Sequence, residues 1–217
     1  MHFRSFAAGV VLCIAPSLGA QSITNGSLTG PIQNGGVPTG WTLLLGSPDT
    51  MDENNNVGGA NGGFGATPTP SPNGGTWLGV GRDGTGFIER FGQTVSGFTV
   101  GQQYRLSWYT ANFGFVSFGY SQPNFFEVLV GGTAVGSGAS RAVSTGWVLE
   151  SVTFTALASS QAIAFQLGSN NKSYMSIDGI SLSAVTSGVV PEPSTYVLMV
   201  TGLTLLGGLS RRKRRVA

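Results

Sequence analysis

The chain has 217 residues, of which 35 are glycine, and only 9% of its residues are charged. This composition disfavours a soluble helical protein and favours a loop-rich β structure, while the 41% hydrophobic content supplies enough apolar side chains for a core. Between residues 23 and 190 there are five bases and eight acids, a net charge of −3. Residues 23–190 therefore lack the excess of positive charge that is typical of nucleic-acid-binding proteins, and we expect no nucleic-acid partner.

The first 22 residues are typical of a secretory signal peptide. Arg4 supplies a positive charge, residues 6–15 are apolar, and Pro16 precedes small residues. The single histidine, His2, and the single cysteine, Cys13, both lie in this leader. Because the leader has the features of a signal peptide, we expect export through the Sec translocon. The mature protein should lack Ser-His-Asp and Cys-His catalysis, and zinc sites of the usual composition.

The next part of the chain is dominated by turns and loops. Residues 22–46 are rich in turn signals and end in the apolar run 41–45, and residues 46–76 contain so much Gly, Asn and Pro that we expect no regular element there. An oxygen-rich cluster in this loop either binds calcium or is simply solvated. Its members are Asp49, Asp52, Glu53, Asn54, Asn55 and Asn56.

After residue 76 the sequence consists of short segments separated by glycine- and serine-rich turns. In one of them Tyr104, Leu106 and Trp108 alternate with more polar residues, as in a half-buried strand. Together with the run 41–45 these segments predict about eight strands; they are 76–81, 86–95, 102–111, 124–132, 145–156, 161–169 and 173–185. Without a convincing helix between residues 22 and 190, we expect an all-β fold, either a β-sandwich or a barrel.

Three glutamates lie within the predicted strands. A glycosidase would need two carboxylates that face each other across a cleft, and no pair among Glu89, Glu127 and Glu150 stands out. We interpret the three as solvated strand residues and predict that the protein is not an enzyme.

The C-terminal segment contains three features in a fixed order. Pro191, Glu192, Pro193 and Ser194 come first, the apolar run 196–209 follows, and a basic cluster ends the segment. The cluster consists of Arg211, Arg212, Lys213, Arg214 and Arg215. As a helix, the 14-residue run would span about 21 Å, less than the hydrocarbon core of a bilayer. The bases would stop transfer and keep the end in the cytoplasm.

These features resemble the PEP-CTERM sorting signal of exopolysaccharide-producing Gram-negative bacteria. The resemblance implies that an exosortase cleaves near the PEP motif while the chain is transiently in the inner membrane, and that the protein then reaches the cell surface or extracellular matrix. The alternative is a permanent single-pass anchor. The expected organisation is a signal peptide at 1–22, a β-sandwich at 23–188 and a sorting signal with a transmembrane helix at 189–217.

The body resembles the galactose-binding-like jelly roll of carbohydrate-binding modules, over roughly residues 23–185. The matching stretches are "NGSL", "FGQTVSGFTVGQQYRLSWYTA" and "YMSIDGISLSAV". The resemblance implies binding of a polysaccharide, here an exopolysaccharide, and a structural calcium ion held by an aspartate in the last strand, a role that fits Asp178. Ser27 and Leu28 stand where such modules have a second acidic residue. No other cofactor is expected.

Carbohydrate modules bind sugars by stacking exposed aromatic rings on them and by hydrogen bonds from polar side chains. Five aromatic residues in and near the stretch 112–126 are predicted to bind glycan: Tyr109, Phe113, Phe115, Phe118 and Tyr120. The alternative is that these rings pack in the core at a sheet edge. The alternative function of the body is a structural or adhesive component of a biofilm matrix that binds no specific glycan.

Overall fold

The protein is described from a computed structural model, in which residues 21–55, 63–186, 198 and 200–203 are placed. The chain divides into two compact units, Met1–Ala184 and Val185–Ala217. The described part of the first unit contains ten strands and one short 3-10 helix, η1, which confirms the all-β prediction. The strands are β1 (Thr42–Leu45), β2 (Asp49–Met51), β3 (Trp77–Arg82), β4 (Arg90–Ser96), β5 (Gln103–Ala111), β6 (Phe126–Val130), β7 (Thr133–Ser137), β8 (Val148–Thr155), β9 (Ser160–Leu167) and β10 (Ser173–Ala184), and η1 is Val116–Phe118.

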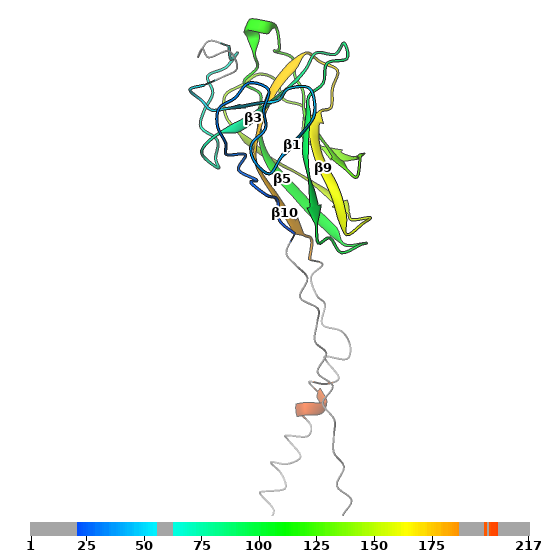
Figure 1. The fold of residues 1–217 in the computed structure, drawn as a ribbon. Coiled ribbons are helices and arrows are strands. Elements are labelled where there is room, and N and C mark those ends of the chain that lie inside the picture. The colour runs from blue at the N-terminus through cyan, green and yellow to red at the C-terminus, as the bar shows by residue number, and fades with distance from the viewer. Residues whose placement is uncertain (1–20, 56–62, 187–197, 199, 204–217) are drawn as a thin grey trace, which may run out of the picture. The chain divides into compact units, whose positions relative to one another are not determined.

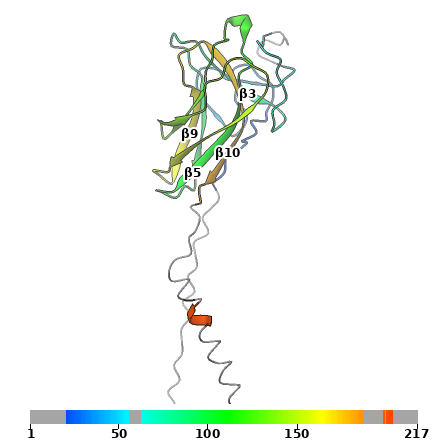
Figure 2. The same cartoon turned by 180° about the vertical axis from the view of Figure 1, so that it is seen from behind.

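The strands form two five-stranded antiparallel sheets that lie face to face. One sheet has the order β1-β4-β9-β6-β7 and the other the order β2-β3-β10-β5-β8. Figure 1 shows β1 and β9 in one layer with β5 and β10 in the other, and Figure 2 gives the view from behind. This arrangement confirms the predicted β-sandwich.

Two of the ten strands were not predicted. β2 lies inside the stretch 46–76, where we expected no regular element, and it pairs with β3 at the edge of its sheet. β7 follows β6 through Gly131 and Gly132, which both have a positive φ, as a tight hairpin turn requires. The apolar run 41–45 was predicted to be a strand, and it forms β1.

Alternation along the strands builds the main core between the sheets. In β5, Tyr104, Leu106 and Trp108 are buried, as the sequence pattern predicts. Phe165 of β9 lies among other rings, with centroids 5.6 Å from Phe91 and 5.6 Å from Trp108. This aromatic centre carries much of the apolar burial that holds the two sheets together.

A second apolar cluster lies on the outer face of the sheet that contains β10, which is the face turned away from the main core. Trp77 packs against Phe113 and Trp147 there, with ring centroids at 6.0 and 5.3 Å. The indole Nε1 of Trp147 donates a hydrogen bond to the carbonyl of Thr69 in the long loop before β3. The loops before β3 and after β5 therefore cover one part of this outer face.

The targeting segments lie almost entirely outside the described residues. Of the predicted signal peptide at 1–22 only Gln21 and Ser22 are described, and the PEP motif and the basic cluster are not. In the second unit, Leu198 and residues 200–203 are helical. Among the residues that are placed, no helix has the length and apolar character needed to cross a membrane.

Candidate functional site

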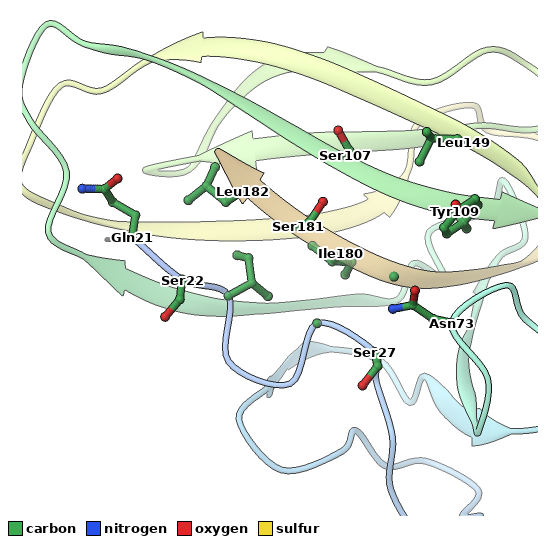
Figure 3. Close-up of a pocket in the computed structure, with 13 residues that line it drawn as sticks. Gln21, Ser22, Ser27, Asn73, Ser107, Tyr109, Leu149, Ile180, Ser181 and Leu182 are labelled. Atoms are coloured by element: carbon green, nitrogen blue, oxygen red, sulfur yellow. The ribbon is translucent and has the colours of Figure 1, made fainter. Parts of the chain in front are cut away.

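A cleft of about 600 Å³ lies on the outer face of the β2-β3-β10-β5-β8 sheet. Strands β5, β8 and β10 form its floor, and residues 21–27 form one wall, of which Gln21 and Ser22 belong to the predicted signal peptide at 1–22 (Figure 3). We call this wall the N-terminal arm. Asn73, from the loop before β3, lies at one end of the cleft and Gln21 at the other. None of the 13 lining residues is charged, and five are serine or asparagine.

A β-bulge in β10 shapes the floor of this cleft. β10 pairs with β5 up to Asp178, opposite Tyr109, and the pairing resumes at Ser181, opposite Ser107. Gly179, within the bulge, has φ +60°, and a Cβ at this position would lie 2.7 Å from the ring of Tyr109. Both the left-handed backbone and this close approach require glycine. The bulge therefore lets the Tyr109 ring lie against the backbone of β10 inside the cleft.

The N-terminal arm is fixed to both sheets. The backbone N–H of Ile180, in the bulge, donates to the carbonyl of Gly26 at 2.7 Å. The side-chain amide of Gln93, on β4 of the other sheet, bonds the backbone N–H and carbonyl of Thr24 at 2.9 and 3.1 Å. A Cβ on Gly26 would overlap the carbonyl oxygen of Ile180. These contacts hold the cleft wall in place against both sheets.

Asp178 is fully buried beside the cleft, next to Gly179. Its Oδ2 accepts a hydrogen bond from the hydroxyl of Ser71, whereas Oδ1 has no hydrogen-bond partner among the described residues. Burial raises the pKa of this carboxyl to about 7, although the Ser71 hydrogen bond opposes the rise.

These surroundings give little support to a calcium site. Calcium takes six to eight oxygen ligands, several of them usually carboxylates. Across the described ranges, no group of three or more Asp, Glu, His or Cys side chains comes together. Ser71 is the only side chain with a hydrogen bond to Asp178 in this part of the chain. The structural calcium ion stays a prediction.

The five predicted glycan-binding aromatics do not form one surface. Phe113 and Phe115 are 1% and 6% exposed, so they pack in the core, as the alternative interpretation had it. Phe118 is 62% exposed and stacks on Phe115, with ring centroids 5.0 Å apart. Tyr120 is half-buried, with the Nζ of Lys172 4.8 Å from its ring centroid. Phe118 and Tyr120 lie on the loop around η1, which we call the tip, whereas Tyr109 lies in the cleft.

Glu89 corrects one interpretation of the sequence. Instead of lying on a solvated strand face, it is 3% exposed and precedes β4. Its carboxylate accepts hydrogen bonds from the N–H of Gly81 at 2.6 Å and the hydroxyl of Ser47 at 3.3 Å. Burial, with a smaller contribution from the nearby charge of Asp49, raises its pKa to about 7.

Asp49 corrects a second interpretation of the sequence. The sequence placed it in a solvated or calcium-binding loop, but it lies in β2 and is buried. Its Oδ2 accepts a hydrogen bond from the hydroxyl of Tyr174 at 2.6 Å, and its Oδ1 accepts one from the N–H of Gly35 at 2.7 Å. Neither Asp49 nor Glu89 lines the cleft.

The other two glutamates are occupied in local contacts. Glu150 forms an ion pair with Arg141, and Glu127 accepts a hydrogen bond from Nε2 of Gln166 at 2.7 Å. Neither lines the cleft, and the cleft lining contains no carboxylate. The arrangement of a glycosidase, with two carboxylates across a cleft, is therefore not found at this site.

Comparison with known proteins confirms the sorting signal. Residues 189–215 match the PEP-CTERM protein-sorting motif. The motif implies an exported protein that is delivered to the cell envelope or surface. A comparison with curated protein sequences found no match.

The fold of the body is similar to that of carbohydrate-binding modules. The tandem CBM22-1–CBM22-2 domain of Paenibacillus barcinonensis Xyn10C is 14% identical with a TM-score of 0.50, over 83% of this chain and 49% of that one. An arabinose-bound α-L-arabinofuranosidase is 12% identical (TM-score 0.49, over 78% of this chain and 27% of that one). The enzymatically active domain of bacteriophage CBA120 tailspike protein 4 is 15% identical, with a TM-score of 0.43, over 67% of this chain and 19% of that one. The chain thus spans about half or less of the length of each.

Sequence reasoning found one residue of the cleft, Tyr109, and missed the others. The signal for Tyr109 was its place on the polar face of an alternating strand. The N-terminal arm and Asn73 are brought to β10 by contacts between segments far apart in the chain. A local sequence pattern does not predict such contacts. The "DG" of Asp178-Gly179 was a usable signal for the bulge, since an isolated glycine in a strand often marks one.

Proposed function

We propose that this protein is an exported, non-enzymatic glycan-binding module that holds its ligand in the cleft beside Tyr109. The observation that carries the proposal is the chemistry of the lining: a half-buried tyrosine ring, hydroxyl and amide side chains, and no charge. A ring offers a stacking face for a sugar, and the hydroxyls of Ser107 and Ser181 with the amide of Asn73 offer hydrogen bonds to sugar hydroxyls. The jelly-roll fold shared with carbohydrate-binding modules supports the proposal.

The proposal predicts that Tyr109→Ala weakens glycan binding by about tenfold or more, since the variant loses the only aromatic face in the described lining of the cleft. We would measure the retardation of the purified protein in native gels that contain the exopolysaccharide of its host or a panel of plant and bacterial polysaccharides. Phe118→Ala is the matched control, because it removes an exposed ring at the tip instead.

Binding that survives Tyr109→Ala but is lost in Phe118→Ala would move the site from the cleft to the tip. If wild-type protein is not retarded by any polysaccharide, glycan binding is wrong.

A structural role in a matrix has its own supporting observation. Leu43, Leu44 and Leu45 are 43–48% exposed on β1, an edge strand of its sheet. Exposed apolar edge strands favour pairing with another chain. Self-association of wild-type protein in sedimentation experiments, without retardation in the gels, would favour this second function.

We also propose that an exosortase removes the C-terminal signal near Pro191–Ser194 and that the Sec translocon exports the chain. The matched PEP-CTERM motif supports the first step, and the leader-like N-terminus supports the second. After transient passage through the inner membrane of a Gram-negative host, the protein would lie at the cell surface or in the matrix.

Sorting by cleavage predicts the mass of the mature protein. Intact-mass measurement of protein from its native host should show the loss of residues 1–19, 1–20 or 1–22 and of residues 196–217. Recovery of a membrane form that has lost the leader but keeps the basic cluster Arg211–Arg215 would show instead that the segment is a permanent anchor.

A further inference from the structure

Beyond the lined part of the cleft, the outer face of the sheet continues along the seam between β5 and β10. The register places three rows of residues side by side on the outer face of the sheet: Leu149, Tyr109 and Asp178; then Ser151, Ser107 and Ser181; then Thr153, Arg105 and Ser183. The first two rows contribute to the cleft lining, and the third lies one step beyond. Tyr109 and Arg105 are four positions apart along β5, about 13 Å at the rise of a strand, a distance that a short oligosaccharide can span.

In the described strands, the residues that lie between the cleft lining and Arg105 on this face have small side chains. The residues beside it, Thr153 and Ser183, are small and exposed, and so is Ser181 in the row before. A chain of sugars that leaves the cleft along this seam would therefore pass directly over the side chain of Arg105.

Arg105 is available for an external partner. It is exposed, and among the described residues its guanidinium forms no ion pair or side-chain hydrogen bond. It is the one exposed charged residue in the five strands of this sheet, because Asp49 and Asp178 are buried while Arg82 and Glu150 are half-buried. The other strand arginines have partners: Arg82 bonds the carbonyl of Leu167, and Arg90 bonds Gln166.

We propose that Arg105 is a specificity-determining residue that pairs with a carboxylate on the bound glycan, so that the ligand is a uronic-acid-containing polysaccharide. The inference rests on the proposed glycan-binding function. A guanidinium presents parallel N–H donors that match the two oxygens of a carboxylate. The uncharged cleft holds the ring and hydroxyls of one sugar, and the carboxylate of a neighbouring sugar meets Arg105.

The test compares polymers that differ only in charge. Polygalacturonate, polyglucuronate and alginate are each used beside their carboxyl-reduced forms, and affinities are measured for the full exported protein by titration calorimetry. We expect the wild type to bind at least one uronate polymer about tenfold more tightly than its reduced form, a difference of about 1.4 kcal/mol. In Arg105→Gln the two affinities should come within about twofold of each other.

Lys172→Gln is the matched control. It removes one positive charge from an exposed residue beside the tip, away from the cleft. This variant should keep the tenfold preference. Loss of the preference in Lys172→Gln as well would assign it to the overall charge of the protein and overturn the inference.

The remaining outcomes separate this inference from the function on which it rests. If the wild type binds both forms equally and Tyr109→Ala abolishes that binding, the cleft binds glycan and the role of Arg105 is wrong. If Arg105→Gln keeps the preference, the role of Arg105 is also wrong. If Tyr109→Ala changes no affinity, or if no polymer of either form binds, the cleft is not a glycan site and both proposals fail.

Discussion

Replacing Phe165 with alanine is expected to lower the free energy of unfolding by about 3–5 kcal/mol, since the change removes a fully buried ring and leaves a cavity. Phe165 stacks on Phe91 and meets Trp41 and Trp108 edge-on, with ring centroids at 5.6, 6.3 and 5.6 Å. These rings come from both sheets. The cavity therefore opens in the contact that holds the sandwich together.

Urea unfolding followed by tryptophan fluorescence would measure this loss. Leu157→Ala is the control, because Leu157 is 79% exposed and its truncation should change the unfolding free energy by less than about 0.5 kcal/mol. Similar small losses for the two variants would show that Phe165 is not in a packed core.

Replacing Glu89 with glutamine is expected to stabilise the protein at pH 8 by about 3 kcal/mol and to have little effect at pH 4. Burial raises the pKa of Glu89 in the folded state to about 7 from an ordinary value of 4.5. Between these values the unfolded chain releases a proton that the folded chain keeps. Wild-type stability therefore falls as the pH rises from about 4.5 to 7, and the penalty is complete above that range.

Glutamine is a close substitute for the protonated carboxyl in this site. Its carbonyl oxygen can accept from the N–H of Gly81, and its amide can donate to the hydroxyl of Ser47. Unfolding free energies at pH 4, 6 and 8 would show whether the two proteins diverge as the pH rises. A difference between them that stays constant over this range would mean that Glu89 is not held protonated by the fold. Asp178, whose pKa is also raised to about 7, titrates in both proteins and cancels in the comparison.

Strands with clear alternation were predictable from the sequence. The inward residues of β5 and β9 follow a period of two, which places every second side chain on the face toward the main core. β2 was missed because its three residues lie within a loop-like composition, and pairing with β3 provides what the local sequence lacks. Short edge strands of this kind depend on tertiary contacts more than on intrinsic propensity.

The candidate site was predictable only in part, for reasons that the particular residues make clear. Phe113 and Phe118 are both phenylalanines in one glycine-rich stretch, yet one is buried under Trp77 and the other is exposed at the tip. Composition cannot separate them, because the outcome depends on which loops fold over the outer face of the sheet. Glu89 was interpreted as solvated because of its charge, yet it is buried, and its carboxylate accepts hydrogen bonds from Gly81 and Ser47.

The most direct test of this account is a map of where a glycan touches the protein. Backbone amide chemical shifts of isotope-labelled protein would be recorded during titration with an oligosaccharide from a polymer that retards it in gels. The account predicts that the shifts change around Tyr109, Asn73 and Ser181, the residues that line the cleft. Changes confined to Phe118 and Tyr120 at the tip, with the cleft residues unmoved, would contradict it.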